Sequence, residues 1–526
     1  MRALAMLLLL LALPQAGWGQ VMAFEGSLVN DPNGTGVQGL AGGFDATVSP
    51  DGQNVYTAAF GGDQVGVFAR DPVTGSLSFL EAFSDGAPPL DGLMGAYAAE
   101  LSPDGQNLYV SGQADDAVTV FSRDPLTGLL TPIQTLHNTD PGIDGIGAAS
   151  GLVVSPDGGQ VYVTSQSQQS VTVFTRAPGT GLLSFLERQS SDPNAPANPN
   201  KPMPVGLLGA EAVTVSPDGL FVYVAAAAGS LPAGGALVAF TRDPSTGSLT
   251  FFGLAGDGVG GVTGLVGARS VSIPADGKSL YVAGPGSAGI DPLGSMVVFD
   301  RDPSNGFLVF REKVIQGGPV LGMGQPYEVV VSPDDTQLYV AALLTDSIAL
   351  FDRNTSPDPN DPNQYFGQPI FSEVLANGFG GVTGMDAATS VALDPTGSHA
   401  YVTAAFSNAI TTFSIDTDQD SVKNATDNCR YIANLSQLDS GGFSTPVPDG
   451  IGDVCQCGDV SGDGIVNVTD SVVLERFLGG LPPGVDATKC SVAGAEECNV
   501  TDSVVLKRAL GGLPPGISQV CTAAVP

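Results

Sequence analysis

Three charged side chains, Glu211, Arg269 and Glu328, stand where they could act on a carbonyl group. Each lies at or next to the start of a predicted strand, and a Gly-Ala pair directly precedes both Glu211 and Arg269. A carboxylate there can act as general base for a water that attacks a carbonyl carbon, while a guanidinium stabilises the oxyanion. The alternative is a structural ion pair of Arg269 with Glu211 or Glu328. We favour the ion pair, because such pairs also gather inside channels.

These side chains belong to a set of seven positions, each five residues before a recurring turn motif. In a ring of repeats the innermost strands converge, so the residues that lead them should surround one mouth of a central channel. We call this set the mouth ring and expect it, with the adjacent Asp45 and Glu328, to bind a ligand. Its members are Phe44, Tyr97, Ser150, Glu211, Arg269, Tyr327 and Thr389.

A second chemistry, the binding of a hard cation, is indicated after residue 415. Oxygen-bearing side chains recur there at alternate positions, which lets an extended loop surround Ca²⁺, an ion that accepts about six to eight oxygen ligands. The predicted ligands are Asp416, Asp418, Asp420, Asn424 and Asp427.

Residues 459–470 have the ligand spacing of a helix-flanked calcium loop, with Gly464 where the loop must turn sharply. The predicted ligands are Asp459, Ser461, Asp463, Asn467, Asp470 and the backbone of Ile465. A second copy of this unit has Ser491, Ala493 and Ala495 at three of the ligand positions. We therefore expect no calcium in the second copy.

All six cysteines lie between residues 429 and 521. In an exported chain this distribution predicts a disulfide framework around small modules. Cys490 and Cys498 flank the degenerate second loop and could close it, and Cys457 and Cys521 could join the ends of the same module.

Composition excludes several classes of function. The 53 acidic and 19 basic residues give a net charge of −34, which excludes a nucleic-acid binder because phosphate backbones are held by clustered lysine and arginine. Two histidines are too few for a multi-histidine metal centre or a histidine proton relay. We expect both, His137 in a loop and His399 at the start of a strand, to be exposed.

The elements that position these residues repeat seven times. A Ser-Pro-Asp-Gly turn, first at residues 49–52, stands between an apolar strand and a tyrosine-centred strand; a third strand ending in phenylalanine and a fourth strand follow. Four antiparallel strands in seven copies predict a mainly β protein, a seven-bladed β-propeller. The last copy lacks its fourth strand, and residues 21–29 resemble one, so we expect them to close the last blade. An arginine recurs after the third strand, which favours a structural role: Arg70, Arg123, Arg176, Arg242, Arg301 and Arg353.

The chain divides into four parts. Residues 1–19, with a basic start, an apolar run and a small-residue end, predict a secretory signal, and the run is too short to span a membrane. No later segment is apolar for long enough to do so. We assign residues 20–415 to the propeller, 416–456 to a calcium-binding repeat and 457–526 to a short helical module, and expect a secreted protein.

The repeated Ser-Pro-Asp-Gly, Leu-Tyr-Val and Val-x-Val-Phe-x-Arg-Asp-Pro sequences resemble the lactonase-like, or YVTN-repeat, seven-bladed propellers, which include 6-phosphogluconolactonase. The resemblance covers all seven repeats and implies the fold and a lactone-hydrolysing site at one mouth of the channel. This chain departs from the enzymatic members, whose innermost strands typically begin with a Pro-His-type segment, because no mouth-ring residue is histidine.

The C-terminal sequences resemble two calcium-binding families. Residues 416–456 resemble a thrombospondin type 3 repeat, which implies a Cys429 to Cys455 bridge. Residues 457–526 resemble a type I dockerin, which implies a cohesin-like or cell-surface partner. The alternative is a self-contained cap stabilised by calcium, without a partner.

These observations lead to two hypotheses of function. The first is a secreted propeller that binds or scaffolds an unknown ligand and is tethered through its calcium-binding modules. The second is a secreted lactone hydrolase with Glu211, Arg269 and Glu328 at the channel mouth.

Overall fold

The structure is a computed structural model. It describes residues 21–416, except 32, 35, 87–89, 195–200, 229–233, 288–291, 358–360 and 362, together with residues 423, 424, 470, 474 and 506. The chain separates into two compact units, one of which contains Phe24–Phe413 and the other Ser414–Pro526. Within the described residues, no helix has the length and apolar character needed to cross a membrane.

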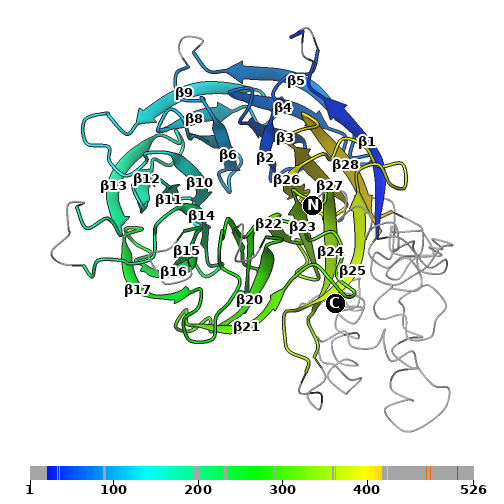
Figure 1. Cartoon of the computed structure of the whole chain (residues 1–526). Coiled ribbons are helices and arrows are strands. Elements are labelled where there is room, and N and C mark those ends of the chain that lie inside the picture. Colours follow the sequence, from blue (N-terminus) through cyan, green and yellow to red (C-terminus); the bar gives the residue numbers. More distant parts are fainter. Residues whose placement is uncertain are drawn as a thin grey trace. The chain divides into compact units, whose positions relative to one another are not determined.

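Seven sheets of four strands each stand around a common centre (Figure 1). This arrangement confirms the predicted seven-bladed β-propeller. The first three blades consist of β2 (Gly43–Val48), β3 (Asn54–Ala59), β4 (Gln64–Arg70) and β5 (Leu77–Ser84); β6 (Ala96–Leu101), β7 (Asn107–Gly112), β8 (Ala117–Arg123) and β9 (Leu130–His137); and β10 (Ala149–Val154), β11 (Gln160–Ser165), β12 (Ser170–Arg176) and β13 (Leu183–Ser190).

The next three blades repeat the same strand order, and blade 5 has a shortened innermost strand. They consist of β14 (Ala210–Val215), β15 (Phe221–Ala226), β16 (Ala236–Arg242) and β17 (Leu249–Gly256); β18 (Ser270–Ser272), β19 (Ser279–Gly284), β20 (Ser295–Arg301) and β21 (Leu308–Val314); and β22 (Pro326–Val331), β23 (Gln337–Ala342), β24 (Ser347–Asn354) and β25 (Gln368–Ala376).

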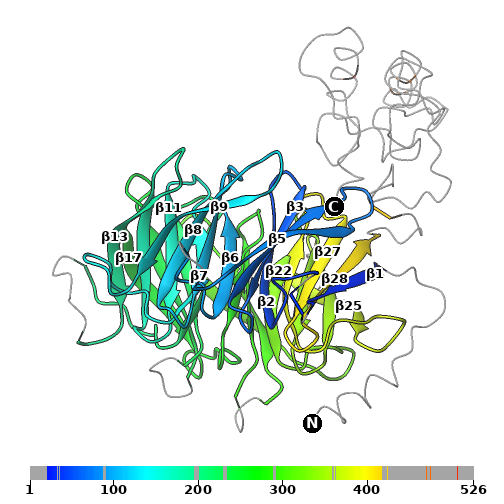
Figure 2. The same ribbon diagram turned by 90° about the horizontal axis from the view of Figure 1, so that it is seen from above.

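The seventh blade joins the two ends of the propeller sequence. It contains β26 (Ala388–Leu393), β27 (His399–Ala404), β28 (Ala409–Ile415) and, as its outer strand, β1 (Met22–Val29). Both views show β1 beside β28 (Figures 1 and 2). Hydrogen bonding between the first and the last strand of the propeller sequence closes the ring and gives the seventh blade its fourth strand.

The turn motif folds locally because its side chains bond its own backbone. In the first copy, the Ser49 hydroxyl donates to the Asp51 carboxylate at 2.5 Å and accepts the backbone N–H of Asn54 at 3.0 Å. Gly52 has a φ of +68°, a left-handed conformation that favours glycine. The motif therefore sets the hairpin between the first two strands of the blade.

The same motif also joins neighbouring blades. Arg123 of blade 2 donates from Nε to the Tyr56 hydroxyl of blade 1 at 2.6 Å and from Nη2 to the Asp51 carboxylate at 2.7 Å. Six such arginine–tyrosine pairs recur around the ring: Arg70–Tyr401, Arg123–Tyr56, Arg176–Tyr109, Arg242–Tyr162, Arg301–Tyr223 and Arg353–Tyr281. The recurring arginines thus hold blades together.

His399 belongs to one of these contacts, and the expectation that it is exposed was wrong. Its side chain is 1% exposed, and Nδ1 lies 3.1 Å from the Asp394 carboxylate and 2.9 Å from Nη2 of Arg70. The physical reason is its place in the blade: the equivalent Asn54 also faces the next blade and accepts from that blade's arginine. The expected loop position of His137 was also wrong: it is the last residue of β9 and pairs with Ala117 of β8, and its side chain is 27% exposed.

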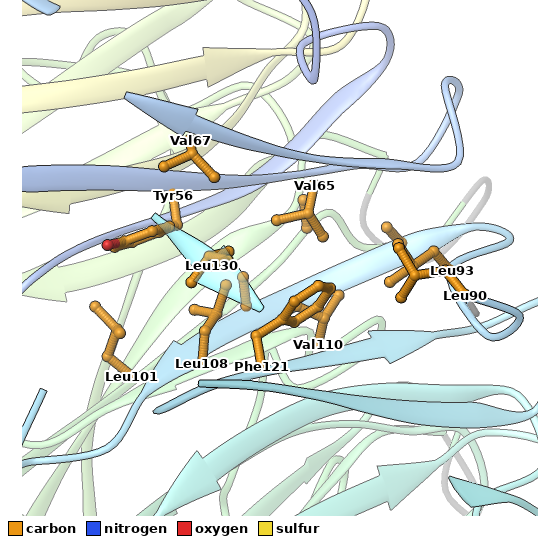
Figure 3. Close-up of a cluster of buried hydrophobic side chains, with 13 residues drawn as sticks. Tyr56, Val65, Val67, Leu90, Leu93, Leu101, Leu108, Val110, Phe121 and Leu130 are labelled. Carbon is orange, nitrogen blue, oxygen red and sulfur yellow. The ribbon is translucent and has the colours of Figure 1, made fainter. Parts of the chain in front are cut away.

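The hydrophobic core lies between blades. Figure 3 shows one cluster, in which Tyr56 and Val67 of blade 1 face Leu108 and Phe121 of blade 2. The clusters farther along the chain likewise combine two neighbouring blades. Each blade is therefore stabilised by the blades on either side of it.

Candidate functional site

A cavity of about 270 Å³ lies in the central channel, among the innermost strands of the blades. Its walls come from the innermost strands of all seven blades, β2, β6, β10, β14, β18, β22 and β26, and from Arg269 just before β18. Figure 1 labels six of these strands around the centre. The polar lining includes four carboxyl groups, Asp45, Glu100, Glu211 and Glu328, and one guanidinium, Arg269.

A residue with a left-handed backbone conformation precedes each innermost strand. The residue two positions before each mouth-ring member has a left-handed φ, between 48° and 75°. These residues are Gly42, Gly95, Ala148, Gly209, Gly267, Gln325 and Ala387. In blades 1 to 4, 6 and 7 the pairing with the second strand then shifts register across the mouth-ring position. Such a bulge re-aims the side chain that it carries.

The preceding blade holds the left-handed residue in place through a hydrogen bond. A turn side chain of one blade accepts the backbone N–H of the left-handed residue of the next: Asp63 from Gly95 at 2.7 Å and Asn408 from Gly42 at 2.7 Å. Asp116 and Asp346 do the same for blades 3 and 7. The mouth ring is therefore built by pairs of neighbouring blades.

Glu211 is the centre of a polar cluster at the mouth. It accepts hydrogen bonds from the Tyr97 hydroxyl and from Nε2 of Gln166, each at 2.7 Å, and from Nη2 of Arg269 at 3.3 Å. Its side chain is only 5% exposed, whereas that of Arg269 is 25% exposed. Both oxygens of Glu211 are thus engaged, and Arg269 keeps unused donors beside the cavity.

Aromatic rings line the mouth next to Arg269. The guanidinium carbon lies 4.5 Å from the centre of the Tyr327 ring, and Nη1 donates to the Tyr327 hydroxyl. Phe44 has its ring centre 4.3 Å from that of Tyr97 and 5.5 Å from that of Tyr327. Burial, together with the charge of Glu211, raises the pKa of the Tyr97 hydroxyl, so it stays protonated.

A second polar cluster, which we call the channel carboxyls, consists of Asp45, Glu100 and Glu328. Asp45 accepts the backbone N–H of Ala99 at 2.9 Å and the Ser390 hydroxyl at 3.0 Å, and Glu328 accepts the backbone N–H of Val391 at 2.6 Å.

The channel carboxyls hold their protons more tightly than ordinary carboxyl groups. Burial raises the pKa of Asp45 to about 6. Burial and the nearby charge of Asp45 raise the pKa of Glu100 to about 8 and that of Glu328 to about 8. At neutral pH, Asp45 is therefore the ionised member and the two glutamates are mainly protonated.

The structure brings most of the mouth ring together, but not all of it. Phe44, Tyr97, Glu211, Arg269, Tyr327 and Thr389 line the cavity, as does Glu328. Ser150 is buried, and its hydroxyl donates to the carbonyl of Ala210 in the next blade at 2.8 Å. The Thr389 hydroxyl donates likewise to Gly43 at 3.0 Å. These two hydroxyl groups join innermost strands to each other.

Sequence reasoning missed Glu100, Gln166 and Ser390. Glu100 could have been found, because it stands two residues before a turn motif where the other blades have threonine, serine, valine or alanine. Gln166 follows β11, outside the innermost strand, and only the folded blade brings it to Glu211.

Three of the predicted calcium ligands, Asp416, Asn424 and Asp470, are among the described residues, and all three are buried. Their oxygen-bearing side chains are of the type that Ca²⁺ prefers. The remaining ligands and all six cysteines, with their predicted bridges, lie outside the described residues: Asp418, Asp420, Asp427, Asp459, Ser461, Asp463, Ile465, Asn467, Cys429, Cys455, Cys457, Cys490, Cys498 and Cys521.

Two family models match the chain. Residues 46–200 match "Lactonase, 7-bladed beta-propeller", and residues 415–437 match "Thrombospondin type 3 repeat". The propeller is thus lactonase-like, and a sequence of the thrombospondin type 3 kind follows it.

One curated protein and several solved structures are similar to this chain. A 6-phosphogluconolactonase of Klebsiella pneumoniae subsp. pneumoniae is 26% identical over 162 residues, 30% of this chain and 46% of that protein. The chain therefore matches less than half the length of this curated relative.

Among solved structures, the hydrazine synthase of Kuenenia stuttgartiensis aligns with 18% identity and a TM-score of 0.51, over 73% of this chain and 98% of that chain. A periplasmic gluconolactonase of Pseudomonas aeruginosa aligns with 22% identity and a TM-score of 0.45, over 63% of this chain and 87% of that chain. At 18% identity, the likeness to the first shows the propeller fold alone.

Proposed function

We propose that this propeller hydrolyses a lactone at the mouth of its channel. The observation that carries the proposal is that Arg269, a quarter exposed, lines the same cavity as Asp45, whose pKa of about 6 suits a proton acceptor at neutral pH. The lactonase family match and the 6-phosphogluconolactonase relative support it.

The proposed reaction uses groups of this chain only. Asp45 takes a proton from a water molecule while the oxygen of that water forms a bond to the lactone carbonyl carbon. The free N–H groups of Arg269 donate hydrogen bonds to the oxyanion that forms. The ring C–O bond then breaks, and Glu328, protonated at neutral pH, gives its proton to the leaving oxygen. Proton return from Asp45 to Glu328 restores both groups, so water and lactone yield one hydroxy acid.

Two further side chains have positioning roles in this proposal. Glu211, a candidate base from sequence, is paired with the guanidinium of Arg269 and also accepts from Tyr97 and Gln166. We therefore assign it to holding Arg269. The Ser390 hydroxyl donates to Asp45 and so fixes the orientation of the base.

The test is hydrolysis of a panel of sugar and acyl lactones by the purified full chain. The rate is measured as the base consumed to keep the pH constant, and the rate of spontaneous hydrolysis is subtracted. Asp45→Asn and Arg269→Met should each lower kcat/KM at least about 100-fold, the size expected for loss of a general base or an oxyanion donor. Arg311→Met, which removes an exposed arginine of blade 5, is the matched control and should change nothing. Absence of turnover by the folded wild-type protein across the panel would reject the hydrolase.

The second candidate function is binding without turnover, in a scaffolding protein. The mutual pairing of Glu211, Arg269, Tyr97 and Tyr327 favours it, since a closed network of this kind also stabilises a plugged channel. A folded protein that binds a lactone or its product and does not turn it over would support this candidate.

Export and tethering are part of the proposal. The N-terminal sequence supports secretion, and the thrombospondin type 3 match supports calcium binding after the propeller. Asp416 and Asn424 would contribute ligands to the first calcium site and Asp470 to the second. Attachment of residues 457–526 to a cohesin-like or cell-surface partner rests on the sequence resemblance to a dockerin.

A further inference from the structure

Carboxyl groups predominate among the ionisable side chains around the channel cavity. Asp45, Glu100, Glu211 and Glu328 bring carboxyl groups from four blades to its wall. Among the described residues that line the cavity, Arg269 alone is basic, and it is already paired with Glu211. A ligand that carries negative charge would meet these carboxyl groups without a free cluster of cations to balance it.

From this juxtaposition we propose that the channel selects an uncharged lactone of a single sugar ring and rejects the phosphorylated form of the same sugar. Proteins hold phosphate esters with clustered arginine and lysine side chains or with helix N-termini. The described lining offers neither beyond Arg269. The selectivity concerns the substrate class of the proposed hydrolase and rests on that function.

The shape and chemistry of the wall suit a single ring. Phe44 and the neighbouring rings of Tyr97 and Tyr327 present apolar faces against which the C–H groups of a sugar can pack. The carboxylate of Asp45 can accept hydrogen bonds from sugar hydroxyl groups. The volume of about 270 Å³ is just below the usual range of ligand pockets, about 300 to 1,000 Å³, which favours one ring over a long acyl chain.

Binding and turnover are measured separately on the full chain. Calorimetry uses two lactams that cannot be hydrolysed, glucono-1,5-lactam and its 6-phosphate, and turnover uses the two corresponding lactones. At pH 8.5 the phosphate ester carries about two negative charges, because its second pKa is about 6. We expect the phosphorylated lactam to bind at least about 30-fold more weakly than the neutral one.

The matched variants are Glu100→Gln, in the channel, and Glu81→Gln, on β5, where Glu81 accepts the backbone N–H of Leu130. Both changes remove one carboxyl group and keep a similar shape. At pH 8.5, Glu100→Gln should reduce the preference for the neutral lactam about fivefold, and Glu81→Gln should leave it unchanged. At pH 6 the effect of Glu100→Gln should vanish, because Glu100 is then protonated in the wild type.

Each outcome decides the inference. Phosphorylated lactam bound as tightly as the neutral lactam, or tighter, overturns it, and so does failure of both lactams to bind. A preference for the neutral lactam without hydrolysis of either lactone supports the inference and rejects the hydrolase. An equal effect of the two glutamine variants would show that net charge, and not the channel wall, sets the preference, and would also overturn it.

Discussion

At the scale of single residues, the arrangement of the channel carboxyls is informative because their environments differ. Asp45 accepts hydrogen bonds from the backbone N–H of Ala99 and from Ser390, which favour its ionised form and oppose the effect of burial. Glu100 faces the charge of Asp45 in addition to burial, and both raise its pKa. Groups whose proton affinities are pushed apart in this way are suited to separate acid and base roles.

The pH dependence of kcat/KM follows from these values. Asp45 must be ionised and Glu328 protonated, so kcat/KM should rise with pH through about 6 and fall through about 8. Because the charge of Glu100 helps to raise the pKa of Glu328, Glu100→Gln should move the falling limb to lower pH and leave the rising limb in place. Initial rates between pH 5 and pH 9 measure both limbs, and a profile without a falling limb contradicts the assignment of Glu328.

At the scale of elements, the blade repeat does two tasks. Its turn motif supplies the carboxylate, and its second strand the tyrosine, that hold the arginine of the next blade. The turn after the second strand supplies the side chain that holds the start of the next innermost strand. Contacts therefore join neighbouring blades at both ends of the innermost strands. These contacts fix the positions of the mouth-ring residues.

The contact between blades 2 and 3 provides a stability test. Arg176, with a side chain 3% exposed, donates to the Tyr109 hydroxyl at 2.8 Å and to the Asp104 carboxylate at 2.7 Å. Arg176→Met keeps the chain length but removes these bonds, and should cost about 3 kcal/mol and lower the melting temperature by about 4 °C. Thermal unfolding of the full chain measures the change.

The matched control uses a second arginine–aspartate pair at the surface. Arg311 and Asp300 have side chains 43% and 30% exposed, so Arg311→Met should cost less than about 1 kcal/mol. Equal melting temperatures for Arg176→Met and Arg311→Met would show that the contacts between blades carry no special stability.

At the scale of the whole molecule, the two compact units are expected to depend on different interactions. The described propeller is stabilised by packing between blades and by the closing strand β1. The C-terminal residues carry the acidic repeats, and calcium binding would neutralise their mutual repulsion.

Calcium should therefore affect the two units differently. Calorimetric titration of the full chain should detect two sites, of which Asp418→Ala removes one and Asp463→Ala the other. Asn499→Ala, in the degenerate second loop, is the control and should remove none. Chelation should make the C-terminal residues more sensitive to proteolysis and leave the melting transition of the propeller within about 1 °C. Loss of the propeller transition on chelation would show that the ring itself requires the ion.

The sequence by itself determined the number of blades, the turn chemistry and the residues that lead the innermost strands, because these depend on local patterns that repeat. Counting back from the turn motif was enough to locate Tyr97, Glu211 and Arg269, which the structure brings into contact with one another. Local pattern is informative here because each blade places equivalent residues at the same height along the channel.

Only the tertiary structure decided which of these residues interact. Glu100 and Asp45 are far apart in the sequence, yet closure of the ring turns both toward one cavity and raises their pKa values. From the sequence, His399 was predicted to be a surface residue. In the structure the next blade covers it and places Arg70 against its ring. Burial and interactions between charges arise where two blades meet. The sequence of a single repeat therefore does not predict which side chains the neighbouring blade will cover.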